Sequence, residues 1–85
     1  MHVVAVHTIT DPGKFFPAAA AGMQEMPAGL RVHSMAPSRD GSKAVCIWET
    51  DSLEAVRSLV EETVGDSSSN ELFEVDATNA IGLPA

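Results

Sequence analysis

The sequence predicts an α+β fold in which two helices cover one face of a four-stranded antiparallel sheet. Short segments rich in valine and isoleucine alternate with turn clusters, which is typical of strands. Two other segments repeat apolar residues at helical spacing after a capping residue. The predicted order is strand, helix, strand, strand, helix, strand, and we expect the 85 residues to form one domain, residues 1–85.

The first part of the chain predicts a strand followed by a helix. Residues 3–9 form the strand, which ends at the turn cluster around Pro12. Asp11 can cap a helix that has Pro12 in its first turn and runs to about Glu25. Pro17 lies deep in this segment, so the helix either kinks there or begins there.

The second part predicts a hairpin, a helix and a last strand. Residues 30–36 and 43–49 pair around a turn at 37–42. Asp51 and Glu54 have the spacing of a capping box. Apolar residues then recur on one helical face before Gly65: Leu53, Val56, Val60 and Val64. Residues 66–70 are expected to form a polar loop and residues 72–77 a short strand.

Two such split units form the ferredoxin-like βαββαβ fold. Side chains alternate between the faces of a strand, and we assign the more uniformly apolar sets to the helix-covered face. These are Leu30, Val32, Ser34, Ala36, Val45, Ile47, Phe73 and Val75. The first strand is ambiguous, and its even positions, Val4 and Val6, are taken to join them. The open face then has His7, Arg31, His33, Met35, Cys46, Trp48, Glu74 and Asp76.

Composition suggests what the protein binds. The chain is 45% hydrophobic, which is high for so small a domain, and this predicts a homodimer through the open sheet face. The net charge of -7 argues against nucleic acid and anionic membranes. No apolar stretch is long enough for a membrane span. The single Cys46 and a short apolar run at 3–6 predict a cytoplasmic protein.

The open face is the predicted ligand site. Its members are His7, His33, Trp48, Met35 and Glu74, and no catalytic residue is assigned among them. Trp48 suits stacking on a flat molecule or filling a dimer interface. Cys46 is interpreted as inert packing. Cofactor fingerprints and metal-ligand motifs are missing, so we assign no cofactor and no metal ligand.

The segments at 43–49 and 71–76, with the order of elements, resemble the dimeric α/β-barrel superfamily of ferredoxin-like proteins. The resemblance implies two sheets packed face to face around a ligand. That superfamily includes monooxygenases, isomerases and haem-handling proteins, and no catalytic motif of any subfamily is matched.

Three functions therefore remain open. We expect a homodimer that binds a small molecule. The alternatives are a cofactor-independent monooxygenase or isomerase, and a transition-metal-binding protein in which His7 and His33 meet near a carboxylate such as Glu74.

Overall fold

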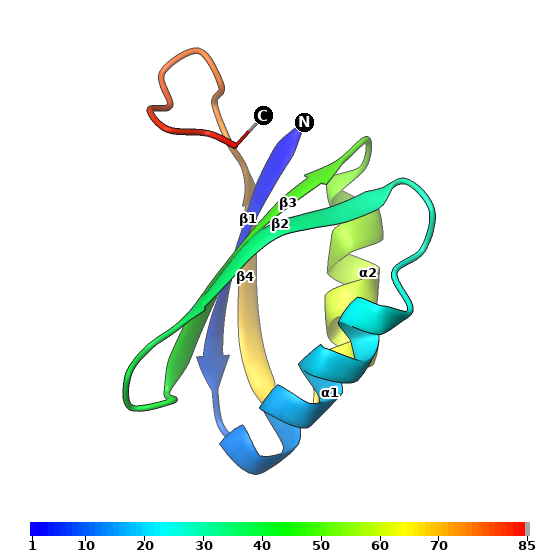
Figure 1. Ribbon diagram of the computed structural model, residues 1–85, viewed down its shortest axis with the longest axis vertical. Coiled ribbons are helices and arrows are strands. Elements are labelled where there is room, and N and C mark those ends of the chain that lie inside the picture. Colours follow the sequence, from blue (N-terminus) through cyan, green and yellow to red (C-terminus); the bar gives the residue numbers. More distant parts are fainter. Residues whose placement is uncertain (85) are drawn as a thin grey trace.

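The computed structural model describes residues 1–84 and has the predicted ferredoxin-like fold (Figure 1). Its elements are β1 (His2–Ile9), α1 (Pro12–Gln24), β2 (Leu30–Pro37), β3 (Lys43–Thr50), α2 (Leu53–Val64) and β4 (Ser68–Glu74). The four antiparallel strands lie in the order β2-β3-β1-β4, and both helices cover one face. Among the described residues, neither helix has the length and apolar character to cross a membrane.

The helix starts follow local capping chemistry. Asp11 accepts a hydrogen bond from the Lys14 backbone at 3.3 Å, so α1 begins at Pro12 and includes Pro17 within it. At α2 the prediction that Asp51 is the cap is wrong. The structure has Ser52 there, whose hydroxyl accepts from the Ala55 backbone at 3.2 Å, because β3 continues through Thr50.

The last strand begins earlier than predicted. Ser68 and Ser69, which we expected in a loop, pair with Ile9 and Thr8 of β1. The Ser68 hydroxyl also donates to the Val64 carbonyl at 2.8 Å and fixes the strand to the end of α2. The pairing stops at Glu74 because β1, its partner strand, starts at His2.

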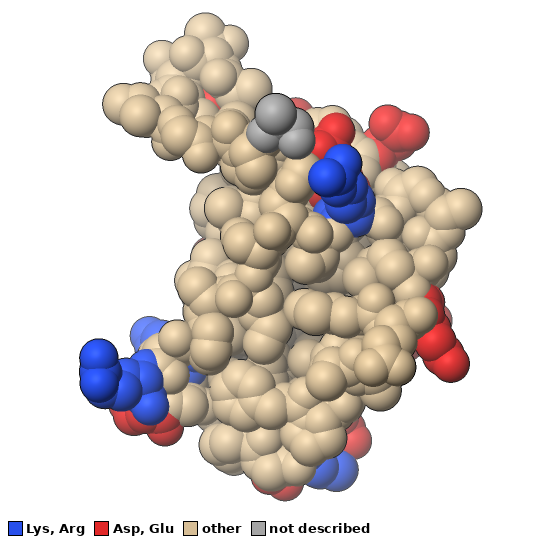
Figure 2. Space-filling view, viewed as in Figure 1, with Lys and Arg blue, Asp and Glu red and all other residues tan. Residues whose placement is uncertain are grey.

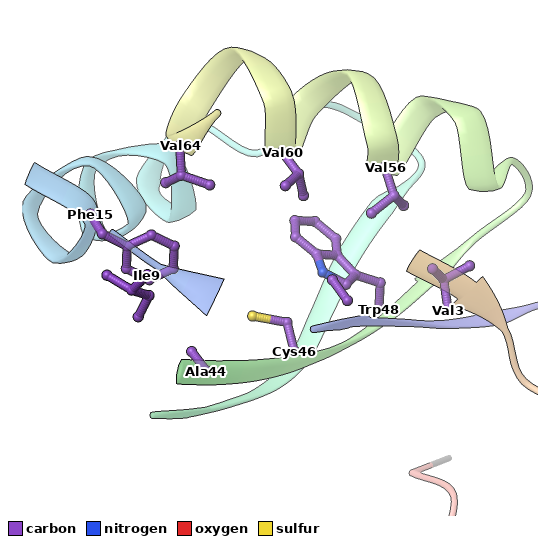
Figure 3. Close-up of a cluster of buried hydrophobic side chains, with 10 residues drawn as sticks. Val3, Ile9, Phe15, Ala44, Cys46, Trp48, Val56, Val60 and Val64 are labelled. Atoms are coloured by element: carbon purple, nitrogen blue, oxygen red, sulfur yellow. The ribbon is translucent and has the colours of Figure 1, made fainter. Parts of the chain in front are cut away.

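The predicted assignment of faces is wrong for three of the four strands. The helix-covered face contains Val3, Ala5, Ala44, Cys46 and Trp48, which are all buried. The buried side chains between α2 and the sheet are seen in Figure 3. The open face instead has residues we expected in the core: Val4, Val6, Val45, Ile47 and Phe73. Val75, also expected there, lies beyond the end of β4. Both faces of β1 and β3 are apolar, so alternation alone does not say which one the helices cover.

A β-bulge in β2 reverses the alternation of its side chains between the two faces of the sheet. Val32 lies opposite Trp48 and Met35 opposite Cys46, with His33 inserted at the irregularity between them. Leu30, Val32 and Met35 therefore face the helices, while Ser34 and Ala36 face outward. The predicted positions of Leu30 and Val32 are confirmed, and those of Ser34, Ala36 and Met35 are wrong because the extra residue reverses the alternation.

The α2 face is confirmed. Val56, Val60 and Val64 are buried against the sheet, and Leu53 packs at the edge of the same core. Phe15 of α1 completes this core and is 1% exposed.

Candidate functional site

A cavity lies between the two helices and the sheet. Its volume is about 40 Å³. Apolar side chains from both helices and from β2 and β3 form most of its wall: Phe15, Met23, Met26, Met35, Cys46, Trp48, Leu59, Val60 and Val64. His7 of β1 and Thr63 of α2 are the polar side chains of that wall.

Trp48, a residue of the cavity wall, has an unpaired hydrogen-bond donor. Its indole rises from β3 towards Val60 of α2, as Figure 3 shows, and the residue is 6% exposed. Its Nε1 atom is the one buried side-chain nitrogen or oxygen, within residues 1–84, that has no hydrogen-bond partner. An unsatisfied buried donor costs about 1 to 3 kcal/mol. A ligand acceptor that reaches this nitrogen would recover that cost.

His7 brings the second polar group. It is buried, and its Nδ1 lies 2.6 Å from the Asn70 amide oxygen. Asn70 is oriented by its own amide nitrogen, which donates to Glu61 at 3.4 Å. His7 therefore donates through Nδ1, and Nε2 is an acceptor whenever the ring is neutral. A histidine held in this way can bind a donor or accept a proton.

Cys46 is part of the cavity wall but is not a nucleophile at neutral pH. The residue is buried, and burial raises the pKa of its thiol to about 11. Because only the thiolate attacks an electrophile, the protonated sulfur packs as a small apolar group.

A second cluster lies on the opposite, open face of the sheet. His33 Nε2 is 2.7 Å from Glu49 Oε1, and His2 Nε2 is 4.0 Å from the same oxygen. The two imidazole rings stack with their centroids 5.6 Å apart. The hydrogen bond from His33 lowers the pKa of Glu49 below its usual value. We call this group the His2–His33–Glu49 cluster.

The five residues predicted to form one site are divided by the sheet. His7, Met35 and Trp48 surround the interior cavity, whereas His33 lies on the open face. Glu74 is exposed at the end of β4. His7 and His33 therefore do not approach each other, and the predicted metal arrangement that required both is wrong.

From the sequence we gave no role to His2 and did not single out Glu49. Both lie at strand ends that are far apart in the chain, and only the register of β1 on β3 places them opposite each other. The sequence therefore does not reveal that His2 lies opposite Glu49, because it does not specify how β1 pairs with β3.

The open face also has a partly exposed apolar patch, which consists of Val4, Val6, Val45, Ile47 and Phe73. Val45 is 39% exposed and Phe73 is 48% exposed. Figure 2 shows a mostly uncharged surface along this side of the sheet, between the C-terminal segment and the charged β2–β3 turn.

Comparisons with protein-family models, curated proteins and solved structures found no match to this chain. The fold and the geometry of the two faces are therefore the basis for the functional proposal.

Proposed function

We propose that this protein binds a small, mostly apolar molecule in the cavity between the helices and the sheet. The observation that supports this is the buried Trp48 Nε1 donor, which has no partner among residues 1–84 and belongs to a residue of the cavity wall. The expected site thus lies under the helices and not on the open face. It keeps three of the residues predicted from the sequence: His7, Met35 and Trp48.

The cavity wall limits the chemistry of the ligand. An apolar lining disfavours a charged molecule, since no opposite charge is present to offset its loss of hydration. The Trp48 indole requires a hydrogen-bond acceptor, and a carbonyl oxygen has the right geometry. We therefore expect a neutral compound with an apolar body and one carbonyl group.

Binding is expected to involve a movement of α1. A volume of about 40 Å³ admits only a few water-sized groups, so a larger ligand needs space from the helix. Met23 and Met26, at the end of α1 and in the loop after it, are part of the wall, and Met23 is 38% exposed. Methionine side chains change shape readily and so can open a path.

A first prediction compares carbonyl compounds with matched hydrocarbons. Small aromatic ketones and aldehydes are expected to bind, and replacing the carbonyl by a methylene should weaken binding about tenfold or more. In the variant Trp48→Phe, which keeps a ring but lacks the N–H, this preference should disappear. Trp48→Phe removes the only tryptophan and therefore the tryptophan fluorescence signal. Binding to this variant is measured by calorimetry and ligand-observed NMR.

Ile47→Ala is the matched control, because Ile47 neighbours Trp48 but points to the open face. The carbonyl preference should persist in it. Equal affinity for carbonyl and hydrocarbon ligands in the parent protein would contradict the proposal, as would an unchanged preference in Trp48→Phe.

The second part of the proposal is a cytoplasmic homodimer, in which two open faces meet as in the dimeric α/β barrels. The apolar patch supports this, since its half-exposed valine, isoleucine and phenylalanine side chains would leave water. Lys43 lies at one side of the open face and Glu71 at the other. When two open faces meet, Lys43 of one subunit can therefore lie near Glu71 of the second copy. The unpaired, buried Cys46 suits a reducing compartment.

A second prediction tests this dimer. The parent protein should have twice the monomer mass in sedimentation or light scattering at micromolar concentration. Val45→Glu and Phe73→Glu should each raise the dissociation constant more than about a hundredfold, because each buries an unpaired charge. Ala55→Glu, on the exposed face of α2, should leave the mass unchanged. A monomeric parent protein would refute the dimer.

A further inference from the structure

We propose that His2, His33 and Glu49 form a binding site for a divalent transition metal of the zinc class, on the face of the sheet opposite the cavity. Their ligand atoms, two imidazole nitrogens and one carboxylate oxygen, all lie within 4.8 Å of one another. This inference does not depend on the proposed cavity ligand, since no residue of the cluster is part of the cavity wall.

Three strands bring the ligands together. His2 of β1 lies directly opposite Glu49 of β3 in the antiparallel register. His33 of β2 lies at the irregularity after Val32, and its Nε2 is 2.7 Å from Oε1 of Glu49, whose partner in the β2–β3 register is Arg31. Regular alternation also places His33 on the face of Arg31, so the register of the three strands is what brings the ligands together.

The distances are close to those of a bound ion. Ligand atoms that are each about 2.0 to 2.2 Å from zinc lie roughly 3 to 4 Å from one another. His33 Nε2 and Glu49 Oε1 are slightly closer than this, at 2.7 Å, and His2 Nε2 is 4.0 Å from Glu49. To admit the ion, side-chain rotation has to widen the His33–Glu49 pair.

The surroundings of the His2–His33–Glu49 cluster hold its two imidazole rings in place and offer a further metal ligand. The side chain of His33 is 7% exposed and that of His2 is 19% exposed, so both rings are held by packing. The Pro84 carbonyl oxygen lies 3.0 Å from His2 Nε2, on the C-terminal segment that returns to this end of the sheet (Figure 1). It can supply a further oxygen ligand. The fourth position then belongs to this carbonyl or to water.

The donor set selects the class of metal. Imidazole nitrogens favour zinc, nickel, copper and iron, whereas magnesium and calcium prefer oxygen ligands alone. Arg31 is paired with Glu49 in the β2–β3 ladder, and its positive charge opposes that of the ion. We therefore expect the site to bind zinc reversibly and to reject magnesium.

The experiment is a calorimetric titration of tag-free protein with zinc chloride. One zinc ion per chain is expected, and magnesium in excess should not compete. His2→Ala, His33→Ala and Glu49→Gln should each weaken zinc binding by more than about tenfold. Glu49→Gln preserves an acceptor for His33, so this variant separates loss of a metal ligand from loss of folding. Cobalt(II) in the same site should give a visible absorption band that each of the three variants loses.

Glu74→Gln is the matched control, since it removes an exposed carboxylate on the other face of the sheet. Zinc affinity should not change in it. The proposal is overturned if the parent protein binds zinc only in the millimolar range, if magnesium competes equally, or if His2→Ala retains the parent affinity.

Discussion

Replacing Phe15 by alanine is expected to lower the free energy of unfolding by about 3 to 5 kcal/mol, as phenylalanine truncations in packed cores do. Phe15 is 1% exposed, and its ring contacts those of His7 and Phe16, with centroids 5.4 Å and 5.1 Å away. Urea denaturation followed by circular dichroism measures the change.

The matched control is the same substitution on the open face. Phe73 is 48% exposed, so Phe73→Ala should cost the monomer about 1 kcal/mol or less. Both variants are compared at a protein concentration low enough to keep the chain monomeric. A larger loss for Phe73→Ala than for Phe15→Ala would mean that the helices cover the other face of the sheet.

The second large effect is a loss of stability in alkali that depends on Cys46. Burial raises the thiol pKa from 9.0 to about 11. Between these values the unfolded chain loses the thiol proton while the folded chain keeps it, so stability falls as the pH rises. The contribution is complete below pH 9 and is lost towards pH 11, with a total of about 2 to 3 kcal/mol.

Denaturation curves measured at about pH 8 and about pH 10.5 test this in the parent protein and in Cys46→Ala. The alanine variant should be less stable at the lower pH, because it leaves a small void, but it should lose less stability on going to the higher pH. Lys14 also titrates in alkali, since its pKa is raised by the hydrogen bond to Asp66, but both proteins share it. Parallel pH profiles for the two proteins would contradict the prediction.

The candidate sites show how far strand alternation can be trusted. It correctly separated the two faces of β3, with Cys46 and Trp48 on one and Val45 and Ile47 on the other. It did not say which of them faces the helices. The criterion we used, that polar side chains mark the open face, failed at His7, because Asn70 of β4 satisfies the imidazole within the core.

The His2–His33–Glu49 cluster could not be found from patterns in the sequence. His33 was correctly expected on the open face, but its partners were not found, because Glu49 is 16 residues away in the chain and His2 is 31 residues away. No local pattern joins residues at such separations. Their meeting depends on the register of β1 on β3 and of β2 on β3, which is a property of the assembled sheet.

The sequence by itself determined the order of elements and the buried face of α2, and it gave the Asp11 cap as one of two possible starts of α1. These depend on residues within a few positions of one another, whose caps and helical spacing act locally. Tertiary structure alone decided which sheet face is covered, where β4 begins and which side chains share a site. The physical reason is that a strand gains its hydrogen bonds and its burial from neighbours distant in the chain, so its inner face is fixed only when the whole sheet packs.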